Sequence, residues 1–198
     1  MPEKLAAQKL LTRGLRLEYF TLFWNVVGIC ITAIAALRAH SIAVGGFGLD
    51  SLIEIGASAV VIWELTSTRE QTRTKALRFI GVSFYGIATY ILLQVSYLLW
   101  RGSHPAVSTL GIVWTAITLI AMVLLANAKR VTGTQLNNPV LRTEGKVTLI
   151  DAYLAGSVMI GLILNAVFHW WWADLASALI IVYYGFKEGA AALREAKR

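Results

Sequence analysis

Uncharged apolar runs occupy most of this chain. Four runs contain no charged residue: Tyr19–Leu37, Phe79–Trp100, Pro105–Ala128 and Ala152–Ala173. A fifth run, Ala39–Trp63, is interrupted only by Asp50 and Glu54, and a sixth, Leu175–Phe186, is shorter. A helix needs about 20 mostly apolar residues to cross the hydrocarbon core of a bilayer. The sequence therefore predicts an all-α membrane protein with six transmembrane helices.

The composition agrees with this fold class. Hydrophobic residues make up 57% of the 198 residues and charged residues only 15%, against roughly 25% in soluble proteins. The single cysteine, Cys30, excludes a disulfide within the chain and a zinc site built from several cysteines. We expect a basic arm over residues 1–16, a six-helix transmembrane domain over 17–193 and a short tail over 194–198.

The Lys and Arg residues predict the orientation of the chain, because cytoplasmic loops of membrane proteins are enriched in them. Sixteen of the 18 fall in an N-terminal arm, two loops and a tail that six spans would place on one side: Lys4, Lys9, Arg13, Arg16, Arg69, Arg73, Lys75, Arg78, Lys129, Arg130, Arg142, Lys146, Lys187, Arg194, Lys197 and Arg198. We therefore expect a multi-pass protein of the plasma (inner) membrane with both termini in the cytoplasm. The net charge of +7 is spread over these segments without a nucleic-acid-binding motif, so we expect no nucleic-acid partner.

Two acids, Asp50 and Glu54, stand inside the second apolar run along the chain. Residues four apart lie on the same face of a helix. A carboxylate inside a bilayer is costly unless it faces a cavity, a partner or an ion. The nearest basic residues along the chain, Arg38 and Arg69, both lie outside this run. The sequence therefore predicts a pair of functional carboxylates without a cationic partner.

A weak internal repeat adds a third acid. Ser41–Glu54 aligns with Asn138–Asp151 at an offset of 97 residues, which matches Gly48 with Gly145 and ends both stretches on an acid. Similar halves are typical of transporters, whose binding sites lie where the two halves meet. We therefore expect Asp151 to join the two acids of the second run in one site.

Glu144 is a weaker candidate for the same site. On a helix it shares one face with Val147 and Asp151. Arg142 and Lys146 are close to it along the chain. We therefore expect Glu144 mainly to form an interfacial salt bridge, and we rank it below the other three acids as a metal ligand.

At these positions the sequence resembles the cation diffusion facilitators, six-span proteins that exchange divalent metal ions for protons, usually as homodimers. Asp50 and Glu54 match the two ligands of that family's second span, and Asp151 matches the last acid of its fifth span. The motif that precedes the first pair is matched by Ser41, Ala43 and Val44. The resemblance implies a metal site formed by Asp50, Glu54 and Asp151, and it implies a homodimer. Glu144 stays a further candidate because of its position on the helix face.

The sequence departs from the family pattern in ways that bear on the metal. Val147 stands where the family has a histidine, and Phe47 stands where it often has an acid. Zinc prefers nitrogen and sulfur ligands, whereas oxygen-rich sites suit Mn²⁺ and tolerate Fe²⁺ or Co²⁺. The resemblance thus implies a divalent metal ion as substrate: Mn, Fe, Co or Zn. The family's soluble C-terminal domain has no counterpart after Phe186, so we expect a short member of the family.

These features predict a secondary transporter that exchanges a divalent cation for protons. The alternative is a membrane metal-binding or accessory protein on the same scaffold that does not transport, because the ligand set lacks the histidine. We do not expect an enzyme, since the sequence has neither H-E-x-x-H nor G-x-S-x-G and no nucleophile placed beside a base.

Overall fold

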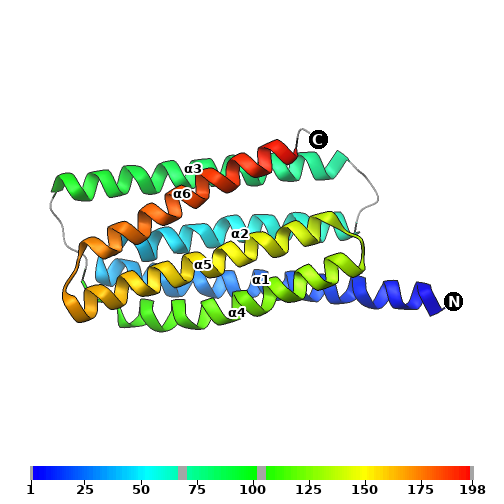
Figure 1. Cartoon of the computed structure of the whole chain (residues 1–198), viewed down its shortest axis with the longest axis horizontal. Coiled ribbons are helices and arrows are strands. Elements are labelled where there is room, and N and C mark those ends of the chain that lie inside the picture. The colour runs from blue at the N-terminus through cyan, green and yellow to red at the C-terminus, as the bar shows by residue number, and fades with distance from the viewer. Residues whose placement is uncertain (1, 67–70, 102–105, 197–198) are drawn as a thin grey trace.

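A computed structural model describes residues 2–66, 71–101 and 106–196 of the chain (Figure 1). Within these ranges six helices follow one another: α1 (Pro2–Ala39), α2 (Ile42–Thr66), α3 (Gln71–Arg101), α4 (Thr109–Gln135), α5 (Pro139–Phe168) and α6 (Trp172–Glu195). Three of the basic residues used for the orientation, Arg69, Lys197 and Arg198, lie outside the described residues.

Four of the described helices are long and apolar enough to cross a membrane: α1 from Leu5, α2, α4 and α5 from Val140. Large apolar side chains also lie exposed on the outside of the bundle, including Leu93, Trp100 and Leu124. An apolar outer surface of this kind is stable when lipid, rather than water, surrounds it. These observations fit the helical membrane protein that the sequence predicts.

Two boundaries differ from the sequence prediction. The run Ala152–Ala173 is not one helix, because His169 adopts a left-handed conformation (φ 57°) that ends α5 at Phe168. The prediction of a loop that holds Lys129, Arg130, Arg142 and Lys146 is also wrong. α4 continues to Gln135 and α5 starts at Pro139, so all four residues lie in helices.

The helices pack as pairs around α2 and α5. α1 lies along α2, α4 lies along α5, and α3 lies along α6 (Figure 1). α2 and α5 also contact each other, α1 contacts α4, and α6 contacts both α2 and α5. Side chains on the facing sides of α2 and α5 are therefore enclosed by other helices.

The starts of α2 and α5 repeat the same local structure at the offset found in the sequence. His40 and Asn137 are both left-handed, with φ of 50° and 51°. The next residue caps each helix: the amide of Val44 donates to Ser41 Oγ (3.1 Å), and the amide of Leu141 donates to Asn138 Oδ1 (2.9 Å). Side-chain caps of this kind satisfy amides that the first turn leaves free. The internal repeat of the sequence thus corresponds to a repeat of structure.

The matched glycines Gly48 and Gly145 mark close approaches within the two helix pairs. A methyl group on Gly48 would overlap the side chain of Thr32 on α1. A methyl group on Gly145 would lie 2.9 Å from the amide nitrogen of Arg130 and 3.0 Å from the carbonyl oxygen of Ala126, both on α4. Close backbone contact at small residues is a common way for helices to associate in membranes. At Gly145 this contact holds α4 and α5 in register beside the site described below.

Replacing Gly145 by alanine is therefore expected to destabilise the bundle. The new methyl group meets backbone atoms that cannot move aside alone, so α4 and α5 must separate, at a cost of about 1–3 kcal/mol. Thermal unfolding in detergent measures the loss. The control is Gly86→Ala on α3, where a methyl group would meet no atom within 4 Å, and this variant should be at least as stable as the parent. Equal stability of the two variants would contradict the packing argument.

Candidate functional site

The carboxyl groups of Asp50 and Asp151 meet in the interior of the bundle. Asp50 comes from α2 and Asp151 from α5, both side chains are buried, and their carboxyl groups lie close enough to interact. Two ionised carboxylates that share a buried site repel each other, so such a pair is suited to bind a proton or a cation. Two of the three ligands expected from the sequence therefore form a buried carboxyl pair.

The third expected ligand, Glu54, has other partners. It lies one turn along α2 from Asp50 and is buried. Its Oε1 accepts a hydrogen bond from Thr148 Oγ1 on α5 (2.8 Å) and lies 3.8 Å from Lys129 Nζ on α4. The prediction that Asp50 and Glu54 have no cationic partner is thus wrong for Glu54, because a lysine far away in sequence reaches it from another helix.

Lys129 is the centre of a buried ionic cluster. Its side chain is 0% exposed, and its Nζ lies 3.1 Å from Glu18 Oε2 on α1 and 3.1 Å from Glu144 Oε1 on α5. It also donates to Thr148 Oγ1 at 3.1 Å. We call Lys129, Glu18, Glu54, Glu144 and Thr148 the Lys129 cluster. Four helices, α1, α2, α4 and α5, meet in it.

The Lys129 cluster has more acids than bases. Three carboxyl groups surround one ammonium group, and neither oxygen of Glu18 accepts a well-aligned hydrogen bond from the described residues. Burying a charge without a partner costs free energy, and a bound proton or cation can neutralise an unpaired carboxylate. The cluster is therefore chemically suited to hold protons or to attract a cation to this depth.

Glu144 does not lie where the sequence placed it. We expected an interfacial salt bridge with Arg142 or Lys146, but Glu144 is buried and pairs with Lys129. The Ser58 hydroxyl on α2 also donates to its Oε1, at 3.4 Å. The reason is the helical register: Glu144 shares the inward face of α5 with Thr148 and Asp151, whereas Arg142 and Lys146 are exposed.

Sequence analysis missed Glu18 and Lys129, although the chain contains a signal for both. Glu18 directly precedes the first apolar run, and Lys129 directly follows the run Pro105–Ala128. In a six-span topology the start of the first span and the end of the fourth lie on the same side of the membrane. Opposite charges at these two ends indicate an ion pair between α1 and α4.

A small cavity lies next to the pair of aspartates, between α2, α3, α5 and α6. It is lined by Asp50, Ile53, Phe84, Ala88, Ile150, Leu154, Ile181, Tyr184 and Gly185. Asp50 is the only carboxylate among them. The cavity therefore lies between Asp50 and side chains of α3 and α6, and no residue of the Lys129 cluster lines it.

Val147 takes the position that corresponds to Asp50 in the second half of the chain, at the offset of 97 residues. It packs against an apolar cluster of Ile53, Ala57 and Phe84. The first half therefore has an acid at both matched positions, Asp50 and Glu54. The second half has Val147 and Asp151 there, and only Asp151 is an acid. This difference explains why the paired aspartates lack a fourth acid opposite them.

In the described part of the chain, no three His, Cys, Asp or Glu side chains stand together in an arrangement that could hold a metal ion. Asp50 and Asp151 provide two neighbouring carboxylates, and Glu54 lies one turn along α2 from Asp50. A third carboxylate ligand is available only if Glu54 turns from Lys129 and Thr148 toward the two aspartates.

Asp174 is a buried acid with a structural role. It lies in the first turn of α6 and accepts hydrogen bonds from Ser41 Oγ and from the amide of Ala43 (3.3 Å). These bonds tie α6 to the capped start of α2. Asp174 is far from the Lys129 cluster along α2, because it contacts the first turn of that helix.

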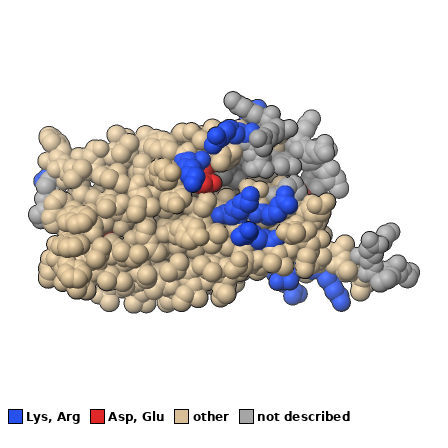
Figure 2. Space-filling model, in the orientation of Figure 1, with Lys and Arg blue, Asp and Glu red and all other residues tan. Residues whose placement is uncertain are grey.

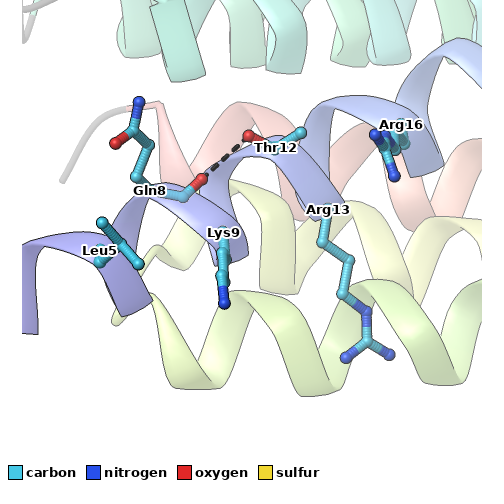
Figure 3. A pocket seen from close by; sticks show the side chains of 6 residues that line it. All are labelled: Leu5, Gln8, Lys9, Thr12, Arg13 and Arg16. Atoms are coloured by element: carbon cyan, nitrogen blue, oxygen red, sulfur yellow. Dashed lines mark hydrogen bonds between the residues drawn. The ribbon is translucent and has the colours of Figure 1, made fainter. Parts of the chain in front are cut away.

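The N-terminal arm forms a second polar surface. It is continuous with α1, and a shallow groove there is lined by Leu5, Gln8, Lys9, Thr12, Arg13 and Arg16 (Figure 3). The three basic side chains are exposed, and the Thr12 hydroxyl donates a hydrogen bond to the Gln8 carbonyl (2.9 Å). All six residues belong to one helix, so the groove is the surface of α1.

Comparison of the chain with known protein families finds no match, and comparison with curated proteins finds none either.

Proposed function

We propose that this protein is a secondary transporter that exchanges a divalent metal cation for protons across a membrane. The observation that carries the proposal is the buried contact between Asp50 on α2 and Asp151 on α5. Carboxyl groups inside a membrane protein typically belong to ion or proton pathways. Here two of them meet between the central helices.

The exchange follows from the chemistry of the pair. Carboxylates bind a metal ion only in the deprotonated form, so metal binding releases protons. A proton held by Asp50 or Asp151 must leave when a divalent ion takes its place. The site then holds either the ion or the proton, and this competition couples the two fluxes.

The repeated structure supports alternating access. Corresponding helices pack in the same way in the two halves. In the first half α1 packs on α2, and in the second half α4 packs on α5. In transporters built from such repeats, the site lies between the halves and opens to either side as they rock. Asp50 and Asp151 come from the corresponding helices α2 and α5.

We propose six spans, with α3 and α6 crossing the membrane as a pair beside the four apolar helices. Both termini then face the cytoplasm. Two features support this topology: the two ends of the chain lie at the same end of the bundle (Figure 1), and Lys and Arg gather toward that end on the face shown in Figure 2. This distribution is typical of a cytoplasmic surface.

The metal and the assembly state follow from the sequence resemblance and remain part of the proposal. Carboxylate oxygens favour Mn²⁺ and tolerate Fe²⁺ and Co²⁺, and Zn²⁺ is a further candidate. The resemblance to cation diffusion facilitators also implies a homodimer in the plasma (inner) membrane.

Metal flux into proteoliposomes tests the proposal. We expect Mn²⁺ uptake that increases when the lumen is acidic relative to the outside, because outward proton flow then drives uptake. The control is the same vesicles with the pH gradient collapsed by a protonophore. Mn²⁺ binding without flux would instead favour a non-transporting metal-binding protein on the same scaffold. The absence of both binding and flux for Mn²⁺, Fe²⁺, Co²⁺ and Zn²⁺ would refute the proposal.

Val147→His is expected to shift metal preference toward zinc. Position 147 corresponds to Asp50 in the other half of the chain, and its side chain packs against Ile53 beside the pair of aspartates. An imidazole there adds the nitrogen ligand that zinc favours. Competition between Zn²⁺ and Mn²⁺ in the flux assay measures the shift, and Val147→Leu serves as the control of similar apolar character. An unchanged preference would mean that position 147 does not reach the ion.

A further inference from the structure

Lys129 and the proposed cargo ion both interact with the carboxylate of Glu54. A metal ion held only by Asp50 and Asp151 has two protein ligands, and Glu54 is the next acid on the same face of α2. Glu54 lies 3.8 Å from Lys129 Nζ and accepts a hydrogen bond from Thr148. Glu54 must therefore leave these partners to bind the ion.

The contacts of Lys129 make this release feasible. Its shorter contacts, each 3.1 Å, are with Glu18, Glu144 and Thr148, and Glu54 is its most distant partner. Without Glu54 the ammonium still pairs with the carboxylates of Glu18 and Glu144, and it donates hydrogen bonds to Glu144 and Thr148. Lys129 can therefore stay buried and neutralised while Glu54 moves.

We propose that Lys129 is a built-in cation that competes with the cargo ion for Glu54. In the metal-free state the ammonium and the Thr148 hydroxyl hold Glu54 away from the aspartates. When the ion binds, Glu54 turns to Asp50 and Asp151, and the ammonium remains with Glu18 and Glu144. This inference rests on the proposed function and adds a residue that sets the affinity of its site.

Such a competitor lowers the affinity of the site for the ion and so favours its release. Three carboxylates in a buried site would hold a divalent cation tightly, and a transporter must let its ion leave on the other side. A lysine that reclaims Glu54 removes one ligand at that moment. The ammonium thus takes the place of a second substrate cation, but it stays attached to the protein.

Two variants with opposite expected effects test the inference, with Mn²⁺ binding in detergent measured by titration calorimetry. Lys129→Gln combined with Glu144→Gln removes the competitor and one acid together, so the net charge of the cluster is kept. We expect this double variant to bind Mn²⁺ about tenfold tighter than the parent. Glu144→Gln alone takes a partner from the ammonium and directs it to Glu54, so binding should weaken.

Two controls separate competition from a general effect on folding. Lys129→Arg keeps the positive charge and should bind Mn²⁺ like the parent to within about threefold, since the effect depends on charge. Adding Glu54→Gln to the double variant should abolish the gain, because the gained ligand is Glu54. If the double variant does not fold, Lys129→Gln with Glu18→Gln, which has the same charge balance, replaces it.

The outcomes separate this inference from the proposed function. The competitor role alone is overturned if the parent protein binds Mn²⁺ through Asp50 but the charge-balanced variants bind it equally or more weakly. A parent that binds no metal, with Asp50→Asn behaving identically, would overturn both. A tighter double variant that no longer depends on Glu54 would show that the gain arises elsewhere, and it would also overturn the competitor role.

Discussion

Asp50→Asn is expected to abolish proton-driven metal flux. The substitution keeps the shape of the side chain and its burial on α2, but it removes the charge that pairs with a cation. Changing a residue that merely orients a metal ligand already costs about 10–100-fold in affinity or activity, so loss of a ligand should reach or exceed the upper value. Mn²⁺ uptake into proteoliposomes, measured with a pH gradient, gives the result.

The matched control for this substitution is Asp174→Asn. Asp174 is also a buried aspartate, but it caps the start of α2 through Ser41 and Ala43 and does not touch the site. In asparagine the remaining oxygen can accept from the Ala43 amide while the NH2 group donates to Ser41 Oγ, so flux should continue. Asp151→Asn should behave like Asp50→Asn. Uptake by Asp50→Asn at the rate of the parent would show that the two aspartates do not bind the cargo.

Lys129→Gln alone is expected to produce the largest loss of stability. It leaves the carboxylates of Glu18, Glu54 and Glu144 buried without the ammonium that now contacts all three. Breaking a buried ion pair in this way typically costs about 3–5 kcal/mol. For a chain of this length, such a loss lowers the midpoint of thermal unfolding by roughly 10 °C or more.

Two further measurements identify the cause of that loss. The double variant Lys129→Gln with Glu144→Gln should recover at least half of the lost stability, because one of the uncompensated carboxylates is gone. Acidic pH should reduce the deficit of the single variant, since protonation neutralises the acids that Lys129 no longer balances. A single variant as stable as the parent would mean that the cluster is already neutral without the lysine.

The general architecture was predictable from the sequence because it depends on patterns that act locally. The length of the apolar runs predicts helices that suit a bilayer, and four of these helices are described with that character. The offset of 97 residues also predicted equivalent places for α2 and α5. The structure bears this out in the left-handed His40 and Asn137 and in the caps that follow them.

The partners of the acids were not predictable in the same way. The sequence indicates that Asp50 and Glu54 share a face, but their actual neighbours, Asp151 and Lys129, come from helices that are distant in the chain. The C-terminal end of α4 was the boundary that the sequence did not predict. The uncharged apolar run ends at Ala128, whereas the helix continues to Gln135 and places Lys129 in the interior. Tertiary packing, rather than local composition, determines this boundary.

If the proposed site exchanges one proton for each ion, the exchange has an electrical consequence. A divalent ion that displaces one proton brings two positive charges to the site and removes only one. If no other group releases a second proton, each exchange carries one net charge across the membrane. A membrane voltage of 100 mV acts on one such charge with about 2.3 kcal/mol. The exchanger would then be electrogenic, and the cell's voltage as well as its pH gradient would determine the direction of metal flow.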